Sequence, residues 1–139
     1  MKIAIAGATG NIGSRVAAKL SAAGAIPVLI GQNEERLKKL NIPNSIIAVA
    51  DLGNTSEIIA ATKDADALFW LVPPLITVTD LKGWYKKVTA AGIAAVNENH
   101  IKKVVLVSSL GVNLDETSGN LAYAAEMEIA FDKLDADVL

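Results

Sequence analysis

A glycine-rich turn close to the N-terminus is the first feature of this sequence that could do chemistry. It reads Gly7-Ala8-Thr9-Gly10-Asn11-Ile12-Gly13 and lies between a short apolar run, residues 3–6, and an alanine-rich stretch of helical periodicity, residues 11–23. Glycine lets the main chain turn tightly and approach a pyrophosphate, and a helix N-terminus offers the phosphates free N–H groups and a positive dipole end. The turn therefore predicts dinucleotide binding, the alternative being that its glycines serve tight packing only.

Two adjacent serines form a second candidate group. Ser108 and Ser109 end an apolar run that begins at Val104. Open α/β sheets bind ligands at the carboxyl ends of central strands, so hydroxyl groups here are well placed to orient a ligand. A serine at the end of a strand can equally cap the loop that follows.

The composition excludes several other chemistries. The 139 residues include no cysteine and a single histidine, His100, which rules out disulfides, thiolate metal sites, a cysteine nucleophile and a multi-histidine site within one chain, so we expect no metal. We expect His100 to cap the end of a helix. Thirteen basic and 15 acidic residues, with no long basic run, weigh against nucleic acid and membrane surfaces as partners. No apolar run is long enough for a signal peptide core or a membrane span, and we expect a cytoplasmic protein.

Short β-branched runs alternate with longer helical stretches along the chain. We expect strands over residues 3–6, 26–30, 45–50, 67–72 and 104–108, and helices over 11–23, 34–40, 54–63, 79–99 and 120–134. The strands are continuously apolar, which is typical of a parallel sheet covered on both faces. The pattern predicts a doubly wound α/β (Rossmann) fold with strand order 3-2-1-4-5 and a sixth strand starting within residues 135–139.

The end of the sequence falls inside that sixth strand. Natural strands average about five or six residues, and only two or three follow the expected start of this one. We therefore expect residues 1–139 to be one domain cut off from a longer protein. In the alternative, Val138 and Leu139 merely cap the last helix at a genuine C-terminus.

Four segments together resemble the NmrA-like branch of the atypical short-chain dehydrogenase/reductases: GATGNIG, Asp51-Leu52, WLVPP at 70–74 and KKVVLVSSLG at 102–111. The resemblance covers essentially the whole chain and implies a Rossmann domain followed by a smaller C-terminal substrate region. It implies phosphate contacts at Gly7, Thr9, Gly10, Asn11, Ile12 and Gly13, adenine contacts at Asp51 and Leu52, and nicotinamide-ribose contacts at Leu71, Val72 and Pro73. Taken alone, Asp51 is equally a turn or capping residue and Leu52 equally a core residue.

The end of the second strand bears on the choice between NAD and NADP. An acidic residue there binds the ribose 2′-hydroxyl, whereas an arginine pairs with the 2′-phosphate. Gly31, Gln32 and Asn33 include no carboxylate, and Gly31 stands where NmrA-like relatives often have an arginine. The positive charge could come from Arg15, Arg36, Lys38 or Lys39, which otherwise lie on solvated helix faces. We expect a slight preference for NADP over NAD.

Tyr123 follows Ser109 by fourteen residues, which resembles the serine and tyrosine of the family. In active members the tyrosine is the general acid or base, and a lysine four residues later lowers its pKa. Position 127 is Met, and a thioether supplies no such charge. Tyr123 could still donate a hydrogen bond to a carbonyl group or stack on a ligand, or it could be a packing residue on the inner face of its helix.

The resemblance implies an NAD(P)H-dependent oxidoreductase that transfers hydride to a quinone-like or other unsaturated small molecule. Ser108, Ser109 and Tyr123 would then lie at the reacting end. The alternative is a regulator that binds the dinucleotide and a protein partner without turnover, which Met127 favours. We expect Trp84 and Tyr85 to serve packing or subunit contact, which leaves a homodimer open.

Overall fold

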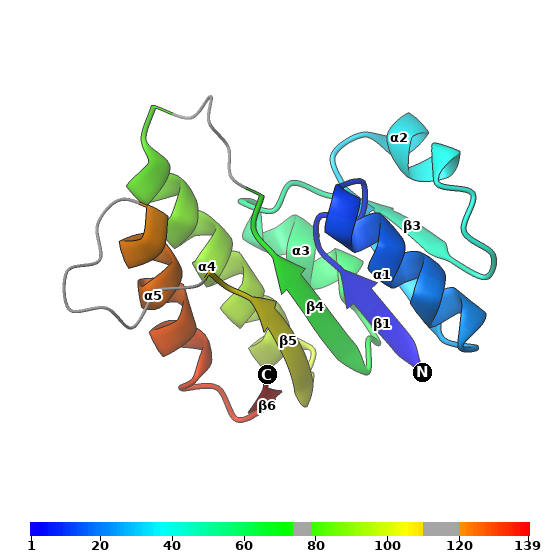
Figure 1. Ribbon diagram of the computed structural model, residues 1–139. Coiled ribbons are helices and arrows are strands. Elements are labelled where there is room, and N and C mark those ends of the chain that lie inside the picture. The colour runs from blue at the N-terminus through cyan, green and yellow to red at the C-terminus, as the bar shows by residue number, and fades with distance from the viewer. Residues whose placement is uncertain (74–78, 110–119) are drawn as a thin grey trace.

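The computed structural model describes residues 1–73, 79–109 and 120–139 (Figure 1). The strands are β1 Lys2–Ile5, β2 Ile26–Gly31, β3 Ile46–Val49, β4 Ala67–Leu71, β5 Lys103–Val107 and β6 Asp137–Val138. The helices are α1 Asn11–Ala22, α2 Glu34–Lys39, α3 Thr55–Ala61, α4 Leu81–Glu98 and α5 Asn120–Phe131. Every expected element is present, and the ends differ from expectation by at most three residues. Residues 74, 110 and 111, which belong to the motifs of the resemblance, lie outside the described residues.

The six strands form one parallel sheet in the order β3-β2-β1-β4-β5-β6, which confirms the doubly wound Rossmann-like fold. Ile5, at the end of β1, is paired in register with Leu29 of β2 on one side and with Phe69 of β4 on the other. The chain therefore leaves β1 and β4 in opposite directions along the sheet. Such a switch point opens a crevice at the carboxyl edge of the strands, where α/β proteins bind ligands.

Helices cover the two faces of the sheet in separate groups (Figure 1). On one face, Ala17 of α1 and Leu37 of α2 pack against Ile5 and Leu29. On the other face, α3, α4 and α5 contribute to a larger core cluster that also contains Trp70 of β4. The alternation of side chains along each strand divides the apolar residues between these two clusters. None of the helices in the described part of the chain combines the length and the hydropathy needed to cross a lipid bilayer.

The start of each of the helices α2, α3 and α4 is fixed by a side-chain cap. Asn33 accepts a hydrogen bond from the N–H of Arg36 at 2.9 Å, Asn54 from Glu57 at 3.3 Å and Asp80 from Gly83 at 2.8 Å. These caps satisfy N–H groups that a helix start otherwise leaves free. At the other end of α4, His100 follows the C-cap residue with a φ of +53°, the left-handed conformation that ends many helices.

Candidate functional site

The turn between β1 and α1 requires glycine at two positions for separate reasons. Gly7 has a φ of +68°, which side-chain-bearing residues rarely adopt. A Cβ atom on Gly13 would overlap the carbonyl oxygen of Gly7 and lie 2.9 Å from the Cα of Ala8. Gly13 therefore allows the first turn of α1 to lie directly against the main chain that leaves β1.

The first turn of α1 differs from those of α2, α3 and α4 because it has no side-chain cap. Its N-cap residue is Gly10, and no acidic side chain lies in its first turn. The N–H groups of residues 11–13 have no hydrogen-bond acceptor among the described residues. Free N–H groups at the positive end of a helix dipole favour an anion, and the glycine turn leaves the main chain accessible to it.

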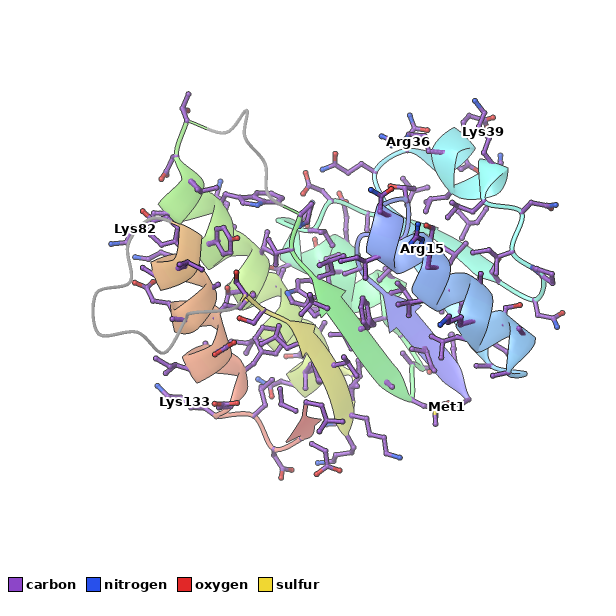
Figure 2. The ribbon with its side chains drawn as sticks, in the orientation of Figure 1. Met1, Arg15, Arg36, Lys39, Lys82 and Lys133 are labelled. Carbon is purple, nitrogen blue, oxygen red and sulfur yellow. The ribbon has the colours of Figure 1, made fainter. Side chains whose placement is uncertain are left out.

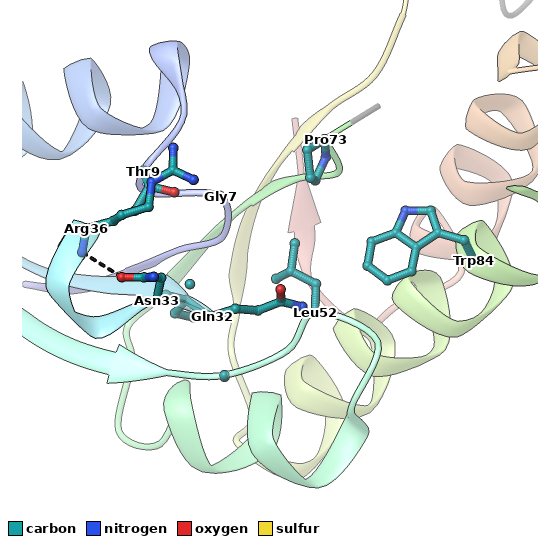
Figure 3. A pocket seen from close by; sticks show the side chains of 11 residues that line it. Gly7, Thr9, Gln32, Asn33, Arg36, Leu52, Pro73 and Trp84 are labelled. Atoms are coloured by element: carbon teal, nitrogen blue, oxygen red, sulfur yellow. Dashed lines mark hydrogen bonds between the residues drawn. The ribbon is translucent and has the colours of Figure 1, made fainter. Parts of the chain in front are cut away.

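A hollow of about 210 Å³ lies beside this turn at the carboxyl edge of the sheet (Figure 3), and we call it the nucleotide hollow. It brings together the ends of β1, β2, β3 and β4 with the first turn of α4. Its lining residues are Gly7, Thr9, Ile30, Gly31, Gln32, Asn33, Arg36, Ala50, Leu52, Pro73 and Trp84. Seven of the candidate cofactor residues from the sequence therefore share this hollow: Gly7, Thr9, Gly31, Gln32, Arg36, Leu52 and Pro73.

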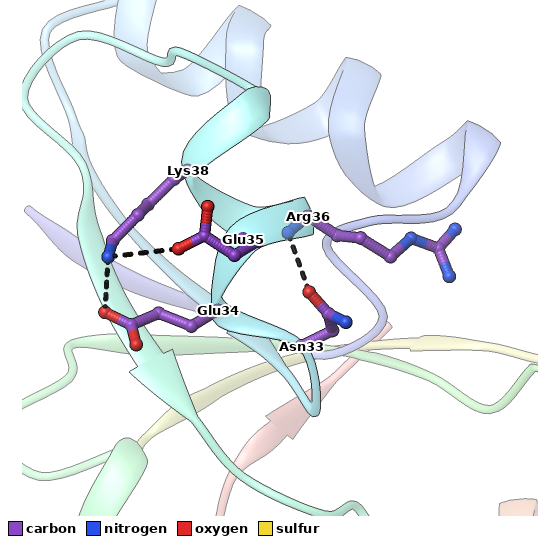
Figure 4. Close-up of polar contacts among 5 residues, drawn as sticks. All are labelled: Asn33, Glu34, Glu35, Arg36 and Lys38. Carbon is purple, nitrogen blue, oxygen red and sulfur yellow. Dashed lines mark hydrogen bonds and ion pairs between the residues drawn. The ribbon is translucent and has the colours of Figure 1, made fainter.

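Arg36 is the cation that faces the nucleotide hollow. Arg36 lines the hollow together with Thr9, its side chain is exposed at the rim, and no ion pair within the described residues engages it (Figure 3). Lys38 extends from the opposite side of α2, where it contacts Glu34 at 2.9 Å and Glu35 at 3.4 Å (Figure 4). The hydrogen bond to Glu34 and its negative charge raise the pKa of Lys38 above its ordinary value.

The other two basic candidates lie away from this hollow. Arg15 and Lys39 are exposed, and neither is among the residues that line it (Figure 2). Arg15 borders a separate shallow depression along the outer side of α1. Of the four basic residues that the sequence offers for a 2′-phosphate, only Arg36 lies at the hollow that the glycine turn borders.

Trp84 is a wall of the nucleotide hollow that the sequence reasoning assigned to packing or subunit contact. Its ring points toward Leu52 and Pro73 (Figure 3), and a Cβ atom on Gly53 would lie 3.3 Å from it. Its indole Nε1 is buried and has no hydrogen-bond acceptor among the described residues. The helical period of residues 81–98 indicates that Trp84 faces inward, but not that the start of α4 reaches the crevice.

Asp51 and Leu52 are adjacent in the sequence but differ in their relation to the nucleotide hollow. Leu52 is buried in the core and also lines the nucleotide hollow, so its core position is confirmed and its contact with adenine stays a prediction. The Asp51 carboxylate accepts a hydrogen bond from the N–H of Gly53 at 2.8 Å, and its own N–H donates to Glu57. Asp51 therefore has the geometry of a turn residue and does not line the hollow.

A second hollow, of about 290 Å³, lies at the ends of β4 and β5, and we call it the serine hollow. Its lining residues are Ile12, Leu71, Val72, Tyr85, Val107, Ser108, Ser109, Ala124 and Met127. It joins the predicted nicotinamide-side residues Leu71 and Val72 to both serines and to the first turn of α1. The Ser108 hydroxyl oxygen is buried and has no hydrogen-bond partner among the described residues.

Tyr123 lies outside the serine hollow. It lines a groove between α4 and α5, where its ring centroid is 5.7 Å from that of Tyr85. Met127, at the position of the family's lysine, is 2% exposed and belongs to the core. The structure thus separates Tyr123 from Ser108 and Ser109 and supplies an apolar neighbour instead of a cation.

The comparisons with known proteins agree with this architecture. The family model described as NAD(P)H-binding matches residues 7–139. No curated protein sequence shows significant similarity to the chain. Among solved structures, a nucleoside-diphosphate-sugar epimerase from Staphylococcus aureus is similar with a TM-score of 0.80 at 15% identity, covering 99% of this chain and 48% of its own.

Two reductases are similar to the same extent. The triphenylmethane reductase of Citrobacter sp., complexed with NADP(H), has a TM-score of 0.77 at 17% identity and covers 99% of this chain and 47% of its own. The NADPH-dependent quinone oxidoreductase of Escherichia coli, complexed with NADPH, has a TM-score of 0.73 at 20% identity. The similarity covers 98% of this chain and 46% of the oxidoreductase. The chain thus spans about half the length of these three proteins, and such identities show a shared fold. Because the family model covers nearly all of the sequence, the chain belongs to the NAD(P)H-binding family.

Proposed function

We propose that this chain is the nucleotide-binding part of an NAD(P)H-dependent oxidoreductase of the NmrA-like type, which reduces a quinone-like or other unsaturated small molecule. One observation carries this proposal: the glycine turn and the uncapped first turn of α1 that follows it lie between the two hollows, because Gly7 of the turn lines the first and Ile12 of the helix lines the second. A dinucleotide bound with its pyrophosphate at this turn would extend its adenosine into one hollow and its nicotinamide into the other.

The nucleotide hollow supports the adenosine end of this arrangement. Leu52 and Trp84 offer apolar surfaces for a flat base. Pro73 lines the same hollow, so we assign it to the adenosine end and not to the nicotinamide ribose, where the resemblance puts it. None of the described residues that line the hollow is acidic, and Arg36 presents a guanidinium at its rim. A guanidinium pairs with phosphate through two parallel hydrogen bonds, so we propose NADP as the preferred cofactor.

The pyrophosphate is assigned to the N–H groups of residues 11–13 and to Thr9. The N–H groups have no acceptor among the described residues, and Gly10 leaves the position free of any side chain. Oxygen atoms of a pyrophosphate would supply the missing acceptors. The residues present therefore fit the group that the family binds.

The serine hollow supports the reacting end. Most of its lining is apolar, which keeps water away from a bound nicotinamide and its acceptor, and Ser108 and Ser109 add hydroxyl groups. When bound, NAD(P)H supplies the hydride. The buried Ser108 hydroxyl would orient the carboxamide or the acceptor, while Leu71 and Val72 would lie along the nicotinamide ribose.

A fluorescence titration and an activity assay test this proposal. NADPH added to the protein should quench tryptophan fluorescence, because Trp84 lines the nucleotide hollow whereas Trp70 is fully buried in the core. NADPH consumption in the presence of menadione should exceed that of a Gly10→Asp variant, whose carboxylate would repel the pyrophosphate. Quenching without consumption above that control would contradict the reduction of menadione-type quinones by this chain.

A non-catalytic regulator is the second candidate, and the Met127 position favours it. A buried thioether four residues after Tyr123 leaves that phenol without the cation used in active short-chain dehydrogenases. A regulator would bind NAD(P)H at the same two hollows and report its redox state to a protein partner. Tight binding with no menadione-dependent oxidation of NADPH would identify this function.

A further inference from the structure

We propose that Tyr85 of α4 donates a hydrogen bond to the carbonyl oxygen of the acceptor in the serine hollow, the role that spacing along the chain suggests for Tyr123. This inference rests on the proposed function and identifies the residue that recognises the substrate. It assigns to the serine hollow a flat, uncharged, conjugated carbonyl compound such as a quinone.

Tyr85 is the tyrosine that lies at the serine hollow. Tyr85 lines the serine hollow together with Ser108 and Ser109, whereas Tyr123 lines the groove behind it and is not among the described residues of the hollow. Tyr85 therefore stands between the two spaces, and Tyr123 reaches the serine hollow only through its ring contact with Tyr85, at a centroid separation of 5.7 Å and an angle of 42°. Tyr85 comes from α4 and the serines from the end of β5, so a ligand between them would be approached by hydroxyl groups of separate elements.

The described lining of the serine hollow suits a neutral ligand. Among the described residues of the serine hollow, the polar side chains are three hydroxyl groups, those of Tyr85, Ser108 and Ser109, and none is charged. Hydroxyl groups donate well to a neutral carbonyl oxygen but leave a carboxylate or phosphate without a counter-charge in an apolar space. The composition of the lining thus selects an uncharged oxygen acceptor over an anionic substrate.

The buried Ser108 hydroxyl lies in the same hollow as Tyr85. Its oxygen has no hydrogen-bond partner among the described residues, although a buried hydroxyl left unsatisfied costs about 1–3 kcal/mol. Such a group is expected where a ligand completes the hydrogen bonding. A carbonyl compound or carboxamide that accepts from Ser108 would lie in the same space that Tyr85 borders.

The phenol of Tyr85 is suited to donating a proton in a hydrogen bond and unsuited to being a base. Burial raises its pKa above the ordinary 10.0. Met127 lines both the serine hollow and the groove together with Tyr85, and its thioether carries no charge. The overall step converts quinone, NADPH and one proton from solvent to hydroquinone and NADP⁺, so Tyr85 keeps its own proton throughout.

The experiment uses the fact that the sequence contains two tyrosines. Protein labelled with ¹³C at the tyrosine Cζ gives two resonances, which Tyr85→Phe and Tyr123→Phe assign. Tetramethyl-1,4-benzoquinone, whose ring carbons are blocked against addition, is titrated with and without NADP⁺, a pair that cannot react. We expect the Tyr85 resonance to shift with saturation and the Tyr123 resonance to shift less. A larger shift at Tyr123, or no shift at either, would overturn the proposal.

A kinetic arm separates this inference from the proposed function. In the active protein, Tyr85→Phe should lower kcat for quinone reduction about ten-fold, the value of one hydrogen bond to the acceptor, and should leave the NADPH Kd unchanged. Tyr123→Phe should lower kcat less. Absence of NADPH binding by the wild-type protein would refute the proposed function, while the quinone titration without NADP⁺ would still decide the role of Tyr85. A kcat loss that is greater for Tyr123→Phe would contradict the inference.

Discussion

The two hollows at the carboxyl edge of the sheet are made of different parts. The nucleotide hollow is formed mainly by main-chain turns and strand ends from the first half of the chain, and Arg36 supplies its charge. The serine hollow is formed mainly by side chains from α4, α5 and the end of β5, together with the end of β4 and Ile12 of α1. A site made of main chain depends on where the chain can turn, and a site made of side chains depends on how each helix is rotated.

The difference has an energetic consequence. Around the nucleotide hollow, Gly13 and Gly7 are in close contact and Asn33 caps the adjoining helix, so structure and binding are coupled there. In the serine hollow, the Ser108 hydroxyl has no hydrogen-bond partner among the described residues, so its removal relieves a cost instead of breaking a contact. We therefore expect substitutions in the glycine turn to reduce stability and binding together, and removal of the Ser108 hydroxyl to weaken ligand binding without a loss of stability.

The largest effect is expected for Gly13→Ala. The added Cβ would overlap main-chain atoms of Gly7 and Ala8, and the turn cannot move without displacing β1 or α1. We expect a loss of more than about 3 kcal/mol in the free energy of unfolding, at the upper end of overpacking costs. Urea denaturation measures the stability, and calorimetry with NADPH should show the binding lost with it.

Gly92→Ala is the matched change on the serine-hollow side of the molecule. Its Cβ would meet the rings of Phe131, at 2.7 Å, and Trp70, at 2.8 Å, which are side chains instead of main chain. Alanine also gains about 1 kcal/mol of helix propensity over glycine. We expect a smaller loss of stability than for Gly13→Ala, and an equal or greater loss would contradict the distinction between the two regions.

Arg36→Gln should weaken NADPH binding by about ten-fold to a hundred-fold, because a charge-assisted hydrogen bond is worth about 1.5–3 kcal/mol. NADH, which lacks the 2′-phosphate, should bind with unchanged affinity. Lys39→Gln removes a charge from the same helix without touching the hollow and serves as the control. Equal weakening of NADPH and NADH by Arg36→Gln would show that Arg36 does not distinguish them.

Ser108→Ala should leave the free energy of unfolding unchanged or raise it by about 1 kcal/mol, since it removes a buried hydroxyl that has no partner among the described residues. Affinity for a quinone should fall in the same variant. Thermal unfolding and quinone titration check the two halves of this prediction. A clear loss of stability would indicate that Ser108 is a structural residue, as Gly13 is beside the nucleotide hollow.

The smallest effect is expected for Asp135→Asn, far from both hollows. Asp135 contacts Lys102 at 2.6 Å, and this hydrogen bond and charge lower the pKa of Asp135 below its ordinary 3.8. A carboxylate with a lowered pKa in the folded state adds stability above its ordinary pKa, and this is lost as the pH falls through the folded value. The urea midpoint of the variant should thus be slightly below wild type at neutral pH and should converge with it in acid. Binding of NADPH should not change.

The features made of main chain could be predicted from the sequence, whereas the placement of individual side chains could not. Gly7 to Gly13, the apolar strands and the strand order are local or topological features, so the fold and most of the nucleotide hollow could be predicted. Trp84 and Tyr85 were placed on the correct inner face of a helix, but a periodic pattern does not indicate which end of that face borders the crevice. The spacing from Ser109 to Tyr123 suggested one site, whereas the rotation of α5 directs Tyr123 into the groove beside α4.

The most direct test of the central claim is calorimetric titration of NADPH and NADH into the wild-type protein and the Gly10→Asp variant, at one salt concentration. If the glycine turn and the two hollows form a dinucleotide site, the wild type should bind NADPH at a single site, more tightly than NADH, and Gly10→Asp should bind neither. Absence of binding to the folded wild type, or equal binding to the variant, would contradict this account.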